Sequence, residues 1–206
     1  MSEVFIKDVR ISFPQLFEAK PFAGEADGVP YYGGSFLFSK DHPAYAQCQK
    51  AIIEVAKAKW KDKTLEVMKA IQEKDKTALH NGDSRTYSGY AGNYFVQTSR
   101  GVDDGRPTVV DRKGSPVTAA DGLVYGGCYV NAKIQFWAQD NKFGKRVNAT
   151  LLGVQFVRDG ESFSGTPRAA RPDEFEDLGD TGETKTASGV KMADNDEEAE
   201  LARMLA

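Results

Sequence analysis

The sequence predicts a mainly β (α+β) fold, a five-stranded antiparallel barrel with an inserted helical segment and a disordered acidic C-terminal tail. Three observations predict it. Strand-like runs separated by turn residues fill most of the first 160 residues, and one stretch, residues 44–79, has helical composition. Residues 172–206 hold too few apolar side chains to offset their ordering entropy. The length of 206 residues suits one domain with an appendage.

The expected strands are bounded by glycine, proline, asparagine and aspartate. They are, in chain order, residues 4–13, 31–39, 93–99, 108–111, 115–118, 128–138 and 147–158. The first two are expected to pair as a hairpin, and residues 111–114 to form the tip of another. Alternation in residues 128–138 assigns one face to the core and leaves Tyr129, Asn131, Lys133, Gln135 and Trp137 on the other. Gly153 marks an expected bulge in the last strand.

The helical segment begins after Asp41 and Pro43, which are typical helix-start residues. Apolar residues then recur at spacings of three and four, with a break near Lys63 and Thr64. This pattern predicts one or two amphipathic helices packed against the barrel.

The net charge of −3 conceals a division of the chain at Arg171. Residues 1–171 carry 24 Lys and Arg against 19 Asp and Glu, a balance of +5, whereas residues 172–206 carry 3 against 11, a balance of −8. A basic body favours a polyanionic partner, and the acidic tail favours regulation or partner binding. The tail ends in a short amphipathic segment whose expected partner-binding residues are Asp194, Asp196, Glu197, Glu198, Glu200, Leu201, Met204 and Leu205.

Cysteine usage predicts a reducing, cytoplasmic setting. Cys48 and Cys128 have no metal-ligand spacing, and the first ten residues lack the charge and apolar pattern of a secretory signal. No apolar run is long enough to cross a bilayer. We therefore expect no membrane association, no metal and no cofactor.

Enzymatic activity has little support in the sequence. His42 and His80 both occupy expected ends of elements, where a polar residue has a local explanation. Asp83, Asp103 and Asp104 could bind magnesium in a nuclease, but they are equally typical of polar loops. We expect a protein that is not an enzyme.

Aromatic residues interleaved with basic ones are the strongest functional signal. Single-stranded nucleic acid needs rings on which bases stack and cations for its phosphates. The candidate stacking residues are Tyr87, Tyr90, Tyr94, Tyr129 and Trp137. The candidate phosphate and polar contacts are Arg85, Arg100, Arg106, Arg112, Lys113, Lys133, Lys145 and Arg146. Each of these aromatic rings could instead belong to the core. The alternative function is that of a protein-interaction module without affinity for nucleic acid.

Six segments in a fixed order resemble a family of tailed-phage single-stranded DNA-binding proteins with an OB fold. They are ISFPQLF (11–17), SFLFSK (35–40), GYAGNYF (89–95), VDRKG (110–114), YGGCYV (125–130) and NATLLGVQFVRD (148–159). The resemblance implies an OB-fold domain over residues 1–171 and a tail over 172–206 that contacts replication or recombination proteins and competes with DNA. It also implies that the protein coats single-stranded DNA in phage replication, recombination and repair, in the host cytoplasm. A homo-oligomer is compatible with this function. The tail ends without the aromatic residue often found in such phage proteins.

Overall fold

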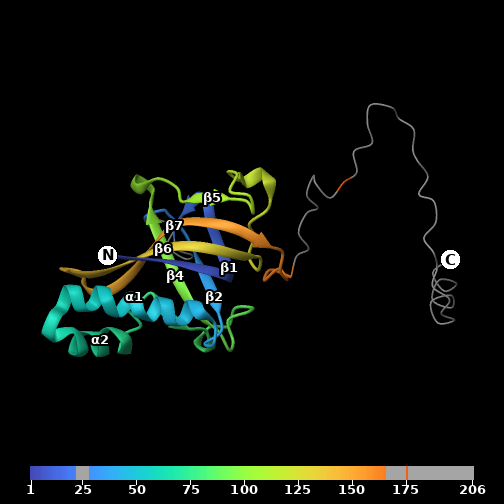
Figure 1. Cartoon of the computed structure of the whole chain (residues 1–206). Coiled ribbons are helices and arrows are strands. Elements are labelled where there is room, and N and C mark those ends of the chain that lie inside the picture. The colour runs from blue at the N-terminus through green and yellow to red at the C-terminus, as the bar shows by residue number, and fades with distance from the viewer. Residues whose placement is uncertain (22–27, 166–174, 176–206) are drawn as a thin grey trace, which may run out of the picture. The chain divides into compact units, whose positions relative to one another are not determined.

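A mixed sheet of seven strands, in the order β3-β4-β2-β1-β6-β7-β5, forms the body of the protein in the computed structural model (Figure 1). The structure describes residues 1–21, 28–165 and 175. The strands are β1 (Ser2–Lys20), β2 (Tyr31–Phe38), β3 (Leu79–Asn81), β4 (Tyr94–Gly101), β5 (Thr108–Val110), β6 (Tyr129–Asn141) and β7 (Gly144–Arg158). The helices are α1 (Pro43–Trp60) and α2 (Thr64–Glu73), with 3-10 turns at Lys61–Lys63, Gly82–Ser84, Val102–Asp104 and Ala119–Asp121.

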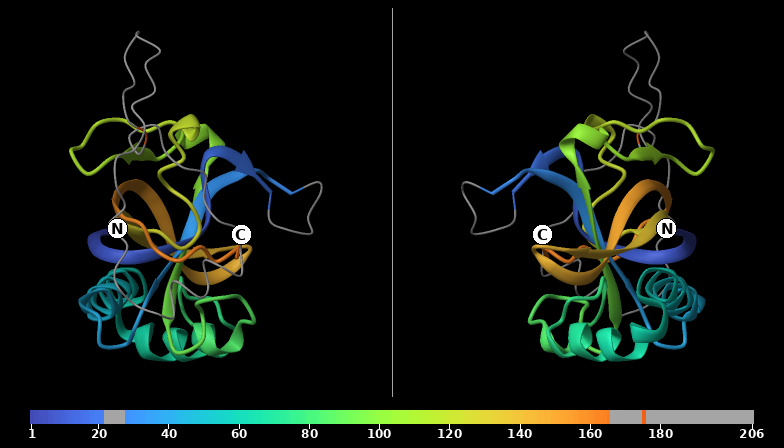
Figure 2. Two further views of the ribbon diagram at one scale, coloured as in Figure 1. Left: turned by 90° about the vertical axis from the view of Figure 1, so that its right-hand side faces the viewer. Right: turned by 90° about the vertical axis from the view of Figure 1, so that its left-hand side faces the viewer.

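The mainly-β fold with a helical insertion is confirmed. The five long strands β4, β2, β1, β6 and β7 are neighbours and pair antiparallel throughout. Two three-residue strands, β3 and β5, extend the sheet at its edges, and β5 pairs parallel to β7. Figure 2 shows the two helices at one end of a strongly curved sheet and the loops that follow β4 and β5 at the opposite end.

The hairpin expected around residues 111–114 is only partly formed. Residues 115–118 form no strand. They meet β5 in a single isolated β-bridge, between Val110 and Pro116. The turn itself forms as expected, since the Asp111 carboxylate accepts hydrogen bonds from the backbone N–H groups of Lys113 and Ser115. The partner of β5 is β7, because Thr108–Val110 lies beside Gly153.

β1 is longer than expected because three irregularities in its pairing let it continue. Its register shifts between Ile6 and Val9 on the β6 side, and between Ser12 and Gln15 and again between Gln15 and Lys20 on the β2 side. Asp8 and Phe13, with φ of 51° and 49°, lie within these shifts. A bulge bends a strand and raises its twist. β1 therefore pairs with β6 through its first half and with β2 through its second.

The core lies between the curved sheet and α1. Alternation in β6 is confirmed, since Val130, Ala132, Ile134 and Phe136 are all fully buried. The bulge expected at Gly153 is also present, as a register shift where Gly153 and Leu151 oppose neighbouring residues of β6. At the start of α1, His42 Nδ1 accepts a hydrogen bond from the backbone N–H of Ala44, so this histidine caps the helix.

Hydrogen bonds between distant segments draw the two halves of the sheet together. Arg100 on β4 donates to the carbonyl oxygen of Leu151 on β7 at 3.3 Å. The Val147 N–H donates to the carbonyl oxygen of Lys76, which precedes β3. Among the described residues, no helix is long and apolar enough to cross a membrane.

The two cysteine thiols are expected to resist modification in the folded protein. Desolvation by burial raises the pKa of Cys48 to about 12 and that of Cys128 to about 11, and neither forms a disulfide. The reactive thiolate is thus suppressed at neutral pH. We expect a thiol reagent to label both cysteines only after unfolding in urea, and rapid labelling of the folded protein would contradict this.

The raised pKa values of the two thiols also predict that the protein is less stable at high pH. Because the unfolded thiols ionise near pH 9 and the folded ones do not, the free energy of unfolding should fall above that pH.

Candidate nucleic-acid interface

Two adjoining pockets lie on the outer face of β1, β2 and β4, and we call them together the outer groove. The first has a volume of about 270 Å³ and is lined by Phe13, Gln15, Tyr31, Gly34, Ser35, Arg85, Tyr87, Tyr90, Phe95, Gln97 and Thr98. The second has a volume of about 340 Å³ and is lined by Ser12, Phe13, Pro14, Tyr87, Ser88, Tyr125, Gly126 and residues 162–164. Phe13 and Tyr87 belong to both pockets, so these two rings form the ridge between them.

The ridge is a pair of exposed aromatic rings on a buried aromatic base. Phe13 and Tyr87 are 54% and 55% exposed, and their rings meet edge to face with centroids 5.0 Å apart. Tyr87 in turn contacts Tyr90 at 5.6 Å, and Tyr90 contacts Phe95 at 4.9 Å. Tyr90 and Phe95 are buried with Leu37 in a hydrophobic cluster separate from the main core. The groove therefore presents two rings to solvent on a rigid support.

The backbone at Phe13 explains why this ring is exposed. A positive φ is a genuine outlier for a bulky residue, and Pro14 restricts the chain further. The bulge places Phe13 outside the alternation of β1, so that its neighbours Ser12 and Leu16 are buried while Phe13 is not. Strained, exposed aromatic residues of this kind are typical of binding sites.

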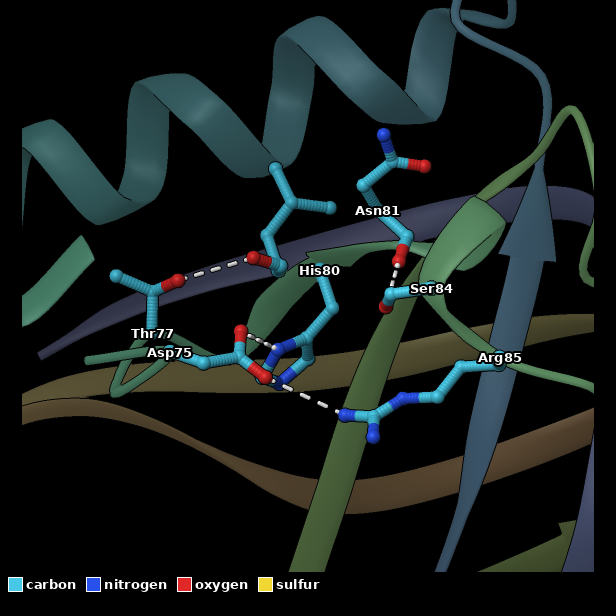
Figure 3. A network of polar contacts seen from close by, with 7 residues as sticks. Asp75, Thr77, His80, Asn81, Ser84 and Arg85 are labelled. Carbon is cyan, nitrogen blue, oxygen red and sulfur yellow. Dashed lines mark hydrogen bonds and ion pairs between the residues drawn. The ribbon is translucent and has the colours of Figure 1, made fainter. Parts of the chain in front are cut away.

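A polar network fixes Arg85 at the wall of the first pocket (Figure 3). The Asp75 carboxylate contacts His80 Nδ1 at 2.6 Å and Arg85 Nη2 at 3.3 Å. The His80 ring stacks on Phe95 with centroids 5.0 Å apart, and the Arg85 guanidinium lies 5.8 Å from the same ring. Asp75 thus joins the end of the helical segment to β3 and to the loop before β4, and positions a cation beside the aromatic residues.

The segment after β7, residues 159–165, forms the far wall of the second pocket, and we call it the strap. The Phe163 N–H donates to the carbonyl oxygen of Gly126 at 3.0 Å, and the Tyr125 hydroxyl donates to that of Gly160 at 2.9 Å. Arg10 donates to the carbonyl oxygen of Glu161, and its guanidinium lies 4.1 Å from the centroid of the Phe163 ring. These contacts hold Phe163 in the groove.

Arginine side chains cover the ring of Tyr129, next to the strap. The guanidinium groups of Arg158 and Arg10 lie 3.3 and 5.7 Å from its centroid, and Arg158 also pairs with Asp8 at 3.1 Å. Arg10 and Arg158 are the neighbours of Tyr129 on the flanking strands. A base could stack on this ring only by displacing a guanidinium.

Comparison with known proteins assigns the chain to a family. Residues 2–185 match the sequence model of the family described as Enterobacter phage Enc34, ssDNA-binding protein. The chain belongs to this family. It is also 40% identical over 179 residues to protein p50 of Acyrthosiphon pisum secondary endosymbiont phage 1, covering 85% of this chain and 94% of that protein. The expected resemblance to phage single-stranded DNA-binding proteins is thereby confirmed.

Solved structures of the Enc34 family protein have the same fold. The single-stranded DNA-binding protein from bacteriophage Enc34 in complex with ssDNA superposes with a TM-score of 0.62 at 29% identity, covering 78% of this chain and 89% of that one. A C-terminal truncation of the same phage protein gives a TM-score of 0.59 at 29% identity, covering 78% and 88%.

The five aromatic residues expected to stack on bases each occupy a different environment. Tyr87 lies on the ridge, and Tyr90, only 2% exposed, supports it from below. Tyr94 packs against Tyr45 of α1 with centroids 4.6 Å apart, on the helix side of β4. Tyr129 is covered by arginines, as described above, and the Trp137 indole donates to Thr150 Oγ1 at 3.1 Å on the outer face of β6 and β7. We therefore revise the roles of Tyr90 and Tyr94 from stacking to support.

Half of the expected phosphate contacts already have partners within the chain. Arg100 donates to the carbonyl oxygens of Asp104, Gly105 and Leu151, which gives it a structural role. Lys133 pairs with Glu3 at 2.9 Å and lowers the pKa of that carboxyl through a hydrogen bond, and Lys145 pairs with Asp140 at 3.7 Å. Of the eight expected residues, Arg106, Arg112, Lys113 and Arg146 are exposed and have no side-chain hydrogen bond or ion pair within the described chain. Arg85 is the one expected basic residue that lines the outer groove.

Of the acidic residues considered for a magnesium site, Asp83 has a local structural role. The Asp83 carboxylate accepts a hydrogen bond from the Gly92 N–H at 2.7 Å. Within residues 1–21, 28–165 and 175, no three metal-ligating side chains gather in one place. The eight expected partner-binding residues of the tail, and the boundary at Arg171, lie outside the described residues.

Sequence reasoning missed four groove residues, Phe13, Gln15, Tyr31 and Phe163, and also Arg10, which packs on the Phe163 ring. Phe13 is the last residue of an expected ordinary strand, residues 4–13, and Gln15 lies two residues beyond it. The Phe13-Pro14 pair was the available signal, because proline is confined to edges and bulges of a sheet. Phe163 lies beyond the last strand and carries no pattern of its own.

Proposed function

We propose that this protein binds single-stranded DNA in the outer groove, with little dependence on sequence. The observation that carries the proposal is the exposed Phe13–Tyr87 pair, shared by two pockets, in a member of a phage single-stranded DNA-binding family. Bases stack on such rings with about 1–3 kcal/mol each, regardless of base identity. Arg85 supplies a cation at the wall of the first pocket, and Arg10 lies against the Phe163 ring that lines the second.

The role we propose is to coat and protect single strands during phage replication, recombination and repair, in the cytoplasm of the host. This role needs no catalytic group. The body carries a charge of +5 over residues 1–171, which favours a polyanion. We further propose that the acidic tail binds replication or recombination proteins.

Titration of a fluorescent oligo-dT and of an equal-length duplex, at two salt concentrations, tests the function. We expect the single strand to bind more tightly, and its affinity to fall with salt as counterions are released from phosphates. Equal affinity for both forms, or affinity that does not change with salt, would contradict the proposal.

Deleting the tail, residues 172–206, is expected to tighten binding of single-stranded DNA. The deletion removes a charge of −8 that would compete with DNA for the basic body. Because the competition is electrostatic, the gain should shrink at high salt. The measurement is the same titration on the full and shortened chains, and unchanged affinity at low salt would exclude self-regulation by the tail.

A further inference from the structure

Gln15 carries a buried hydrogen-bond acceptor without a partner. Its Oε1 is, among the described residues, the one buried side-chain nitrogen or oxygen that no hydrogen bond satisfies. Such atoms are rare in folded proteins, because burying an acceptor without a donor is unfavourable. The same residue lines the first pocket of the outer groove. An unsatisfied acceptor at the wall of a pocket points to a ligand that brings a donor.

The bulge in β1 places Gln15 at this wall. The register shift after Ser12 sets Gln15 opposite Gly33 of β2. Phe13, two residues earlier, forms the ridge of the same pocket. One backbone irregularity thus creates both the exposed ring and the adjacent acceptor.

The surroundings of Gln15 suit a flat aromatic ligand. Phe13, Tyr31 and Tyr87 line the first pocket, and buried Phe95 supports it. Its volume of about 270 Å³ is near the lower end of the about 300–1,000 Å³ typical of small-molecule sites, which suits a single ring system. Thr98, also at the wall, already exchanges hydrogen bonds with the backbone of Gly34. Of the polar side chains that line this pocket, Gln15 is the one whose buried acceptor has no donor among the described residues.

We propose that the first pocket receives one nucleobase and that Gln15 accepts a hydrogen bond from the exocyclic amine of that base. This rests on the proposed binding of single-stranded DNA and adds a base preference to it. Cytosine, adenine and guanine carry an exocyclic amine, whereas thymine and uracil do not. The last torsion of a glutamine side chain is soft, so rotation about it turns the covered oxygen toward the incoming amine. The protein then favours amine-bearing bases at one position of an otherwise sequence-tolerant site.

Oligo-dC and oligo-dU of equal length provide the sharpest probes. The two bases have rings of the same size, and they differ where cytosine has the amine and uracil a carbonyl. We expect the wild-type protein to bind oligo-dC about fivefold more tightly, the effect of one hydrogen bond. In the Gln15→Met variant, which removes the acceptor and keeps the length of the side chain, the two affinities should become equal. Gln135→Met is the matched control, because Gln135 lies on β6, hydrogen-bonded to Glu3, and should keep the preference.

The outcomes separate this inference from the proposed function. Tight binding of both oligomers with equal affinity to the wild-type protein would overturn the base preference and leave the function standing. A preference for oligo-dU would also overturn it, because Gln15 would then act as a donor. Binding of neither oligomer would overturn the function itself. A preference that persists in Gln15→Met would exclude Gln15, and the wild-type ratio alone decides the question if that variant fails to fold.

Discussion

Replacing Phe13 and Tyr87 together by alanine is expected to weaken binding of oligo-dT by about 10- to 100-fold. The two rings form the ridge between the pockets, and each offers a face on which a base can stack. Because both side chains are more than half exposed, their removal should change the melting temperature little. Fluorescence titration and thermal denaturation of the double variant and the wild type provide the two measurements.

Phe143→Ala is the matched control for the loss of an exposed ring. Phe143 is 73% exposed in the turn between β6 and β7 and lines neither pocket. We expect it to bind DNA like the wild type. If the double variant also keeps full affinity while remaining folded, the outer groove is not the binding site, and the outer face of β6 with Trp137 becomes the next candidate.

The fold could be predicted from sequence where one periodicity continues without interruption. Residues 128–138 alternate strictly, and β6 follows that pattern residue by residue. The start of α1 was equally clear, because Pro43 occupies its first position and His42 caps it. In these segments local preference and tertiary packing favour the same structure, which is the condition for sequence reasoning to succeed.

The site was harder to predict because it depends on departures from periodicity. Alternation along β1 fails at Asp8 and Phe13, where non-glycine residues adopt positive φ. A shift of one residue moves a side chain to the other face of a sheet. Pro14 marks the irregularity at Phe13, whereas no glycine or proline marks the one at Asp8. The roles of the tyrosines in residues 87–94 could not be predicted for a related reason. They lie in a loop and at the start of β4, where no period decides which ring is exposed.

The charged residues could be found in the sequence, but their roles could not. Arg85 precedes an aromatic segment and Arg100 follows one, so the sequence gives no reason to assign them different roles. In the structure Arg100 holds the turn after β4, whereas Arg85 is positioned by Asp75 beside the groove. The distinction depends on which carbonyl or carboxylate lies nearby, and that is set by contacts between distant segments.

Gly127→Ala is expected to destabilise the protein by about 3 kcal/mol or more, through backbone strain and a clash with the strap. Gly127 has φ of +112°, and an added Cβ would lie 2.1 Å from the carbonyl oxygen of Glu161. Since Arg10 and Gly126 hold the strap by backbone contacts, it cannot move aside without losing them. Urea denaturation measures the free energy of unfolding, and DNA titration should show weaker binding as Phe163 leaves the second pocket.

Gly114→Ala separates strain from the clash. Gly114 also has a positive φ, of +86°, but an added Cβ would meet nothing within 4 Å. This variant therefore has the conformational cost alone, about 1 kcal/mol, and it should bind DNA normally. Equal destabilisation of the two variants would mean that the strap yields without cost. In that case the contacts of residues 159–165 do not hold Phe163 in the groove, and the second pocket has no fixed wall against which a base could pack.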